Sequence, residues 1–216
     1  QGYSAPQTRF NDDGQVGPSF FQDNSLSTQA EDCLTLNVAT NDTGACKPVM
    51  IWIHGGALVT GGSSSIMYQL NYLAQRDVVV VSINYRLGPL GFLRLSEVTN
   101  GEVNSSGNEG LKDQRNAIEW VKENISSFGG DPNNITIFGE SAGSWSCNLQ
   151  IAAGHDGLFD KAICQSGGLD AIATRDKANR WAELFLNQFK EDGFVLSDLK
   201  SCSWDSIILS LIHISE

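Results

Sequence analysis

A short apolar stretch that runs directly into a glycine-flanked serine constrains the fold of this chain most. Residues 135–138 are almost continuously apolar and rich in β-branched side chains, which predicts a buried strand. Gly139-Glu-Ser-Ala-Gly143 follows at once, and a helical pattern runs from Ala142 to Ala153. A strand, a sharp turn and a helix in this order lift a serine hydroxyl above the edge of a sheet. The glycines suit such a turn because they carry no Cβ atom that would meet the neighbouring elements.

The context of this G-x-S-x-G pattern decides its meaning, because the pattern alone arises by chance in a chain rich in glycine and serine. One alternative is an ordinary turn in which Ser141 caps the helix. The position between a strand and a helix favours a nucleophile elbow, which would expose Ser141 to an ester carbonyl.

A second glycine-rich loop, His54-Gly-Gly-Ala57, follows the predicted strand at residues 49–53. Such a loop lets main-chain N–H groups converge on a developing oxyanion. The alternative is a flexible turn that leads into residues 61–65. Two such signatures in this chain order, each directly after a predicted buried strand, favour the catalytic interpretation of both.

Strands and helices alternate along the chain. Helical periodicity is present at 111–125 and 176–189, strands covered on both faces are predicted at 49–53, 78–83 and 135–138, and a half-buried strand is predicted at 33–38. This alternation predicts an α/β fold, a mostly parallel central sheet flanked by helices. We interpret residues 61–65 and 99–108 as loops within one domain.

The charge balance narrows the function classes. The sequence holds 14 Lys and Arg against 25 Asp and Glu, a net charge of -11. Phosphate backbones are bound by clustered basic side chains, so we expect no nucleic-acid partner. The longest apolar runs, 78–83 and 207–212, are far shorter than the roughly 20 residues of a membrane helix, so we expect no transmembrane segment. The five cysteines include no C-x-x-C pair and give no zinc motif.

The compartment and the oligomeric state stay open. Asn-x-Ser/Thr triplets begin at Asn41, Asn104, Asn124 and Asn134, and they are glycosylation acceptors only in the secretory pathway. They slightly favour secretion over a cytoplasmic location.

An ordered series of motifs resembles the type-B carboxylesterases of the α/β-hydrolase superfamily, a family that also includes cholinesterases, some lipases and the non-catalytic neuroligins. The resemblance covers about residues 30–170. It rests, in chain order, on Glu31-Asp-Cys-Leu-Thr-Leu-Asn37, His54-Gly-Gly-Ala57, Asn84-Tyr-Arg-Leu-Gly88, Gly91-Phe-Leu93, Asn108-Glu-Gly-Leu-Lys-Asp-Gln114, Phe128-Gly-Gly-Asp-Pro132, Gly139-Glu-Ser-Ala-Gly143 and Gln165-Ser-Gly167.

The resemblance implies a role for each residue of the two glycine-rich loops. Ser141 is the implied nucleophile. The main-chain N–H groups of Gly56, Ala57 and Ala142 are the implied oxyanion donors, and Gly55 shapes the loop between them. Ala142 also fits on physical grounds, because N–H groups at the start of a helix are unpaired and lie at the positive end of its dipole.

The implied reaction is hydrolysis of a small-molecule carboxylic ester. Ser141 attacks the ester, the alcohol leaves, and water hydrolyses the acyl-enzyme. Glu140 is implied to lie beside the site and to tune its electrostatics. The resemblance implies no metal and no organic cofactor. The alternative is a non-catalytic cholinesterase-like adhesion or binding domain, although the adhesion branch has lost the serine that this chain keeps.

Several positions depart from the family pattern. Residues 20–23 read Phe-Phe-Gln-Asp where cholinesterases carry a choline-binding tryptophan, so choline esters are not the expected substrates. Residues 1–32 contain no cysteine, so Cys33 lacks the partner that eukaryotic members provide. Leu58 stands where many members carry Phe and indicates a differently shaped pocket.

The acid and the histidine of a serine triad, which follow the serine in this fold, are not found in this sequence. His54 precedes Ser141, and His155 follows it so closely that we interpret it as a surface-loop residue. His213 lies in residues 209–216, Leu-Ser-Leu-Ile-His-Ile-Ser-Glu, which resemble a translated sequencing-library adapter; a genuine amphipathic helix end is the alternative. We therefore expect residues 1–208 to be a partial α/β-hydrolase domain and the chain alone to lack triad-dependent esterase activity.

Overall fold

The computed structural model describes residues 2–7, 28–154, 156–169 and 172–212, apart from the side chains of residues 209, 211 and 212. The predictions for residues 20–23, His155 and His213 lie outside the described residues.

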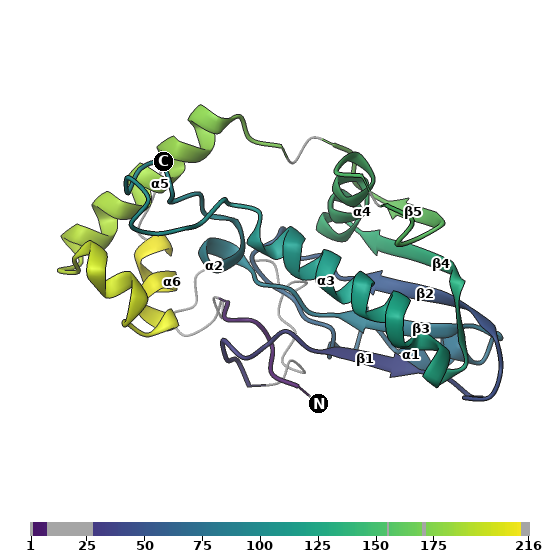
Figure 1. Cartoon of the computed structure of the whole chain (residues 1–216). Helices are drawn as coiled ribbons and strands as arrows, with labels where there is room; N and C mark the ends of the chain where they lie inside the picture. Colours follow the sequence, from purple (N-terminus) through teal and green to yellow (C-terminus); the bar gives the residue numbers. More distant parts are fainter. Residues whose placement is uncertain (1, 8–27, 155, 170–171, 213–216) are drawn as a thin grey trace.

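A five-stranded sheet forms the centre of the described chain (Figure 1). Its strands lie in the order β1-β3-β2-β4-β5, with β1 antiparallel to β3 and the other pairs parallel. Ile53 pairs with Gly139, and Gly139 pairs with Cys164, so β2, β4 and β5 end at one level. The glycine-rich loop after β2 and the serine turn after β4 therefore begin side by side. The strands are β1 (Leu36–Ala39), β2 (Lys47–Ile53), β3 (Val79–Ile83), β4 (Gly130–Glu140) and β5 (Lys161–Gln165).

Helices connect and flank these strands. Two short 3-10 helices, Ile125–Phe128 and Leu196–Lys200, follow α3 and α5. The α-helices are α1 (Leu70–Ala74), α2 (Gly88–Phe92), α3 (Glu109–Asn124), α4 (Ala142–Ala152), α5 (Arg175–Glu191) and α6 (Trp204–Ile212).

The predicted α/β class, with a mostly parallel sheet flanked by helices, is confirmed. The three longest predicted helical segments correspond to α3, α4 and α5, and residues 61–65 and 99–108 contain neither helix nor strand. The sequence analysis did not identify β5, α1, α2 or α6 as elements.

Two strand predictions need correction. The first strand begins at Leu36 and not at Cys33, because the N–H groups of Cys33 and Thr35 donate locally, to the carbonyls of Glu31 and Cys33. Burial on both faces holds for β3, where every residue is buried, but not for β2 and β4, where buried and half-buried residues alternate. On their half-buried face Trp52 packs against Phe138, with ring centroids 4.9 Å apart.

The main core lies between the sheet and helices α3 and α4. Alternate residues of β2 and β4, such as Ile51 and Ile137, are fully buried there with Ile118 and Val121 of α3 and Cys147 of α4. Transfer of such side chains from water supplies about 1.5–3 kcal/mol each, which fixes α4 and the turn before it on the sheet.

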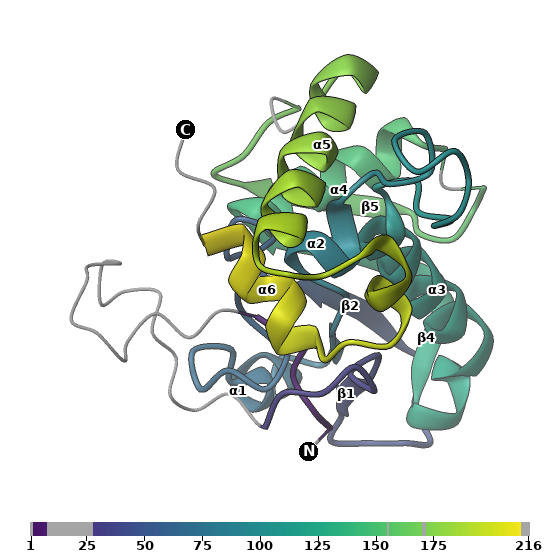
Figure 2. The ribbon, with the colours of Figure 1, turned by 90° about the vertical axis from the view of Figure 1, so that its left-hand side faces the viewer.

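A second hydrophobic cluster lies at one end of the molecule, where α5 and α6 pack together (Figures 1 and 2). Phe185 and Phe189 of α5 stack with ring centroids 5.6 Å apart, and Phe189 also stacks on Phe194. Leu93 and Leu95 join this cluster from the segment that follows α2. The α5–α6 pair is thereby fixed beside α2.

Glu109 and Asp113 anchor the first turns of α3 through charged hydrogen bonds. The Glu109 carboxylate accepts hydrogen bonds from the N–H and the hydroxyl of Ser106, at 2.9 and 2.7 Å, and from Lys112. Burial alone would raise the pKa of Glu109, but these bonds outweigh it and lower this pKa to about 2. Asp113 pairs bidentately with Arg86, through two bonds of 2.7 Å, and so joins α3 to the segment before α2.

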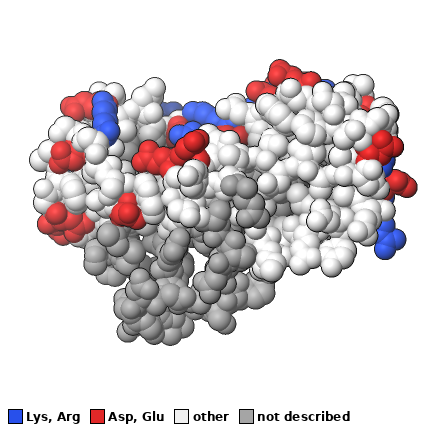
Figure 3. Space-filling model, turned by 90° about the horizontal axis from the view of Figure 1, so that it is seen from below, with Lys and Arg blue, Asp and Glu red and all other residues white. Residues whose placement is uncertain are grey.

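The described surface carries no sign of a membrane span or a metal centre. No described helix is long and apolar enough to cross a bilayer. No group of three or more His, Cys, Asp or Glu among the described residues could hold a metal ion. Seen from below, charged side chains lie at the left end, along the upper edge and at the right rim, and a largely uncharged area lies right of centre (Figure 3).

Candidate active site

The serine turn between β4 and α4 has a strained backbone. Ser141 adopts φ 55° and ψ -121°, a region that non-glycine residues avoid, at a cost on the order of 1–3 kcal/mol. Its N–H donates to the carbonyl of Gln165 in β5 at 2.9 Å, and its carbonyl accepts the N–H of Trp145 at 3.0 Å. The Ser141 side chain makes no capping hydrogen bond to α4, so the helix-cap alternative is not supported.

Glycines allow this turn because neighbouring main chain passes too close for any side chain. A Cβ atom on Gly139 would lie 2.7 Å from the carbonyl oxygen of Ile53, and one on Gly143 would lie 2.1 Å from the same atom. A Cβ atom on Gly167 would lie 2.7 Å from the carbonyl oxygen of Ser141. The serine turn is therefore packed directly on the end of β2 and on the segment after β5.

The loop that follows β2 lies against this turn. A Cβ atom on Gly55 would lie 2.8 Å from the Glu140 carbonyl oxygen and 3.4 Å from Ser141 Cβ. The next three residues all have positive φ: 109° at Gly56, 54° at Ala57 and 64° at Leu58. Such values in two successive non-glycine residues are strained, and they persist only where surrounding contacts hold them. We call residues 54–61 the oxyanion loop, after the role that the family resemblance implies for Gly56 and Ala57.

Three N–H groups in these two segments have no acceptor in the part of the chain that the structure describes. Within the described part of the chain, no acceptor binds the N–H of Gly56, Ala57 or Ala142. The Gly56 carbonyl instead closes the loop by accepting the N–H groups of Val59 and Thr60, both at 3.0 Å. Gly56 is half-buried and Ala57 exposed, while Ala142 begins α4, where the helix dipole is positive. This arrangement can bind a developing negative charge.

His54 supports the loop from below. Its ring is buried and stacks on Tyr85, with centroids 4.4 Å apart, and its Nδ1 lies 2.8 Å from the Gly55 carbonyl. The Tyr85 hydroxyl donates to the His54 carbonyl at 2.7 Å. Burial lowers the pKa of His54 to about 4, which keeps the ring neutral at pH 7. The buried, neutral His54 side chain therefore helps to fix the start of the loop.

Glu140 is the exposed residue that ends β4, directly before the serine. Its carbonyl and its carboxylate both approach Gly55, whose added Cβ would lie 3.4 Å from Glu140 Oε2. The residue implied to lie beside the site is therefore in contact range of the oxyanion loop.

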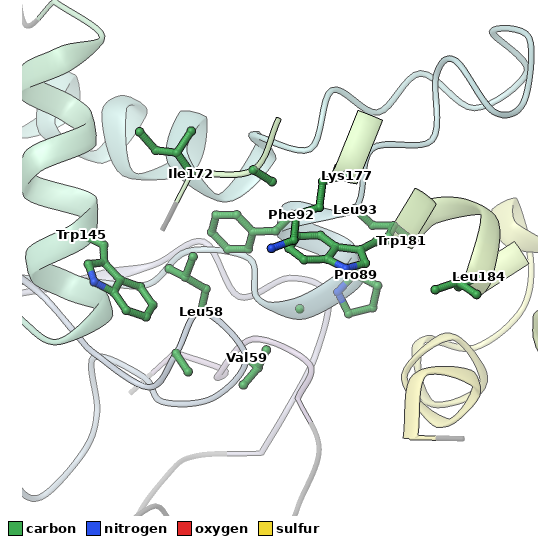
Figure 4. Close-up of a pocket in the computed structure, with 13 residues that line it drawn as sticks. Leu58, Val59, Pro89, Phe92, Leu93, Trp145, Ile172, Lys177, Trp181 and Leu184 are labelled. Atoms are coloured by element: carbon green, nitrogen blue, oxygen red, sulfur yellow. The ribbon is translucent and has the colours of Figure 1, made fainter. Parts of the chain in front are cut away.

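A cavity of about 690 Å³ lies beside the oxyanion loop and is also lined by Trp145 of α4 (Figure 4). This volume suits a small organic ligand. Ser141 is not among the lining residues, but Ala57 of the loop and Trp145, one turn into α4, both are. Lys177 is the single charged lining residue, and its Nζ lies 4.9 Å from the ring centroid of Trp181. The remaining lining residues are Leu58, Val59, Gly88, Pro89, Phe92, Leu93, Ile172, Ala173 and Leu184.

The sequence patterns mark the two segments but not the residues that hold them. Gln165 belongs to a family motif, but no pattern shows that its carbonyl accepts the Ser141 N–H. No pattern marks Gln7, whose side chain bonds the end of the oxyanion loop. Neither role has a local sequence signal, because each depends on a distant backbone group. All five cysteines are free thiols.

Comparison with known proteins gives consistent matches. A family model described as the carboxylesterase family matches residues 6–203. The chain is 48% identical to the para-nitrobenzyl esterase of Bacillus subtilis over 164 residues, which is 74% of this chain and 33% of that protein. It is 45% identical to the bile salt-activated lipase of Rattus norvegicus over 166 residues, 71% of this chain and 26% of that protein. The chain therefore spans a third or less of the length of these relatives.

Solved structures show the same similarity in three dimensions. A pNB esterase structure superposes with a TM-score of 0.82 and 38% identity, covering 100% of this chain and 43% of that chain. Juvenile hormone esterase from Manduca sexta, solved with OTFP covalently attached, superposes with a TM-score of 0.81 and 27% identity, covering 97% of this chain and 39% of that chain. These matches show that the chain has the α/β-hydrolase fold and belongs to the carboxylesterase family.

Proposed function

We propose that this chain carries the nucleophile and the oxyanion donors of a carboxylic ester hydrolase. The proposal rests on the contact between the strained serine turn and the oxyanion loop. A Cβ atom added to Gly55 would lie only 3.4 Å from Ser141 Cβ. The N–H groups of Gly56, Ala57 and Ala142, which find no acceptor among the described residues, lie in these same two segments, which supports their role as donors.

In the proposed reaction, Ser141 Oγ attacks the carbonyl carbon of the ester and its proton passes to a general base. The carbonyl oxygen becomes an oxyanion that accepts hydrogen bonds from the three N–H groups. Collapse of this intermediate breaks the bond to the alcohol, which leaves with the proton. Water then attacks the acyl-enzyme in the same way, which releases the carboxylic acid and restores the serine hydroxyl.

The base in this proposal is a histidine supported by an acid, both outside this sequence. His54 does not fit the role, because it is buried beneath the loop and precedes the serine in the chain. The proposed activity therefore requires a longer protein that supplies these two residues. The 216-residue chain alone is expected to turn over no ester.

The substrate in this proposal is a small carboxylic ester with an apolar acyl or alcohol group. The cavity beside the oxyanion loop is lined by aromatic and aliphatic side chains, including Phe92, Trp145 and Trp181. The relatives named above as an esterase and a lipase favour catalysis over the binding-only alternative.

The test uses the full-length gene product. Wild-type protein is expected to hydrolyse 4-nitrophenyl acetate and to be labelled by a fluorophosphonate at Ser141, as located by peptide mass spectrometry. Ser141→Ala should abolish both signals, whereas Ser206→Ala, a serine at the start of α6, should change neither. A full-length protein that is folded but inert to both reagents would refute the proposal and favour a binding role.

A further inference from the structure

The oxyanion loop needs outside restraints because its own backbone is strained. Ala57 and Leu58 have φ values of 54° and 64°, and the loop ends at Gly61 with φ 107°. Residues in such conformations relax unless the surrounding structure holds them. Contacts that hold this loop therefore help to set the orientation of the Gly56 and Ala57 N–H groups.

The two ends of the loop are held by different parts of the chain. At the start, Tyr85 donates a hydrogen bond to the His54 carbonyl and its ring stacks on the His54 ring. At the end, the restraint comes from Gln7, in the N-terminal segment that lies outside the sheet (Figure 1). A residue more than 50 positions away in sequence thus fixes the loop's second half.

Both the oxygen and the nitrogen of the Gln7 side-chain amide bind the end of the loop. Its Oε1 accepts the Thr60 hydroxyl at 2.7 Å and the Gly61 N–H at 2.8 Å. Its Nε2 donates to the Gly61 carbonyl at 2.9 Å and to the Ala5 carbonyl at 3.1 Å. The residue is 5% exposed, so water does not substitute for these partners in the folded chain. The Gln7 side-chain amide therefore binds both the N–H and the carbonyl of Gly61, as the main chain of a neighbouring strand would.

Gln7 is itself held in place. Its N–H donates to the Gln29 side chain at 3.0 Å, and the main chain of Ser4 bonds to Thr28 and Ala30. Restraint of the loop thus passes from residues 28–30 through residues 4–7 to Gly61.

From this geometry we propose that Gln7 is a positioning residue for the oxyanion loop, which holds the Gly56 and Ala57 N–H groups where the oxyanion forms. The inference rests on the proposed function. A positioning residue of this kind acts on the transition state more than on the bound ester, because the oxyanion exists only as the reaction proceeds. Its loss should lower kcat and leave KM nearly unchanged.

The experiment compares two glutamine-to-methionine changes in the full-length protein, since methionine keeps the side-chain length and removes every hydrogen bond. Gln7→Met removes the bonds to the loop. Gln150→Met is the matched control, because Gln150 is also buried and donates to the Leu111 carbonyl and to Gln114, away from the loop. Both variants are characterised by thermal unfolding, amide hydrogen exchange, and kcat and KM for 4-nitrophenyl acetate.

Gln7→Met should lower kcat about 10- to 100-fold with KM within about threefold of wild type, in line with the loss of oxyanion-hole alignment. Amide exchange should accelerate at residues 59–61 and stay unchanged in β3. Gln150→Met should lose similar thermal stability and keep its kcat. A Gln7→Met protein with wild-type kcat, or one whose kcat falls no more than that of Gln150→Met, would overturn the inference.

Thr60→Val keeps the inference testable if Gln7→Met does not fold. It removes the hydroxyl that donates to Gln7 Oε1 and keeps the side-chain shape. A fall in kcat without a change in KM is the expected result, and an unchanged kcat in a folded variant contradicts the inference. Failure of the proposed function looks different, because wild-type protein itself would then turn over no ester.

Discussion

Gly143→Ala should separate the serine turn from the oxyanion loop. The added Cβ would lie 2.1 Å from the Ile53 carbonyl oxygen, where ordinary contacts begin near 3.4 Å. The clash is with main chain on both sides, so α4 and the end of β2 must move apart by about 1 Å. Overpacking of this kind costs about 1–3 kcal/mol. A clash with main chain belongs to the upper part of this range, about 2–3 kcal/mol, and the better helix propensity of alanine returns up to about 1 kcal/mol, which leaves a net loss of about 1–2 kcal/mol.

This loss should lower the melting temperature by about 2–8 °C in a chain of this size. A displacement of about 1 Å between nucleophile and oxyanion donors should also lower kcat/KM of the full-length protein about 100-fold. Calorimetry and ester hydrolysis measure the two effects. Gly44→Ala is the control, because its nearest atom, Asp42 Oδ1, would lie 3.5 Å away. If Gly143→Ala unfolds and reacts as wild type does, the packing argument for the serine turn is wrong.

Three further predictions concern the titration, the cavity and the thiols. Because the pKa of Glu109 is lowered to about 2 from an ordinary 4.5, its stabilisation is complete above pH 4.5 and is lost as the pH falls toward 2. Glu109→Gln should therefore cost about 1–2 kcal/mol at pH 7, after allowance for solvent screening, and little at pH 2, as read by urea unfolding. Trp181→Ala should raise KM for a benzyl ester about 5- to 20-fold and leave KM for a methyl ester unchanged. The control variant Trp120→Ala, on α3, should change neither KM value. Burial raises the pKa of Cys147 to about 12, so Ellman's reagent at pH 8 should modify exposed Cys46 at once and Cys147 only on unfolding; equal rates would contradict this burial.

The serine turn was predictable because its determinants are contiguous in sequence. Residues 135–138 form the strand, Gly139 and Gly143 permit the close approach, and α4 begins directly after Ser141. The oxyanion loop was predictable for the same reason, since β2 leads into it without a break. Local pattern and local structure coincide at both places.

Elements fixed by distant packing were not predictable. The segment Gly88–Phe92 contains two glycines and a proline and still forms α2, where Gly91 lies close to the Arg86 carbonyl and Phe92 packs against Gly110. The strand β5 has mostly exposed side chains, so no apolar periodicity marks it, and its place comes from pairing with β4. The same limit applied to Gln7, whose partners only the folded chain supplies.

The two halves of the candidate site differ in the sequence distance over which they are assembled, and this bears on how the chain folds. The strand β4, the serine turn, α4 and β5 form one contiguous stretch, residues 130–165, within which the Ser141 N–H reaches the Gln165 carbonyl, while the packing of Gly139 and Gly143 on Ile53 also needs β2 in place. The oxyanion loop is complete only when Gln7 reaches Gly61, across a separation of 54 residues. Closing a longer loop costs more entropy, and contacts of long sequence separation form more slowly. We therefore expect residues 130–165 to pair first and the bond between Gln7 and Gly61 to form last. Partial unfolding would then release the oxyanion loop first. Cleavage of the N-terminal segment by a protease would inactivate the site while the serine turn stays folded.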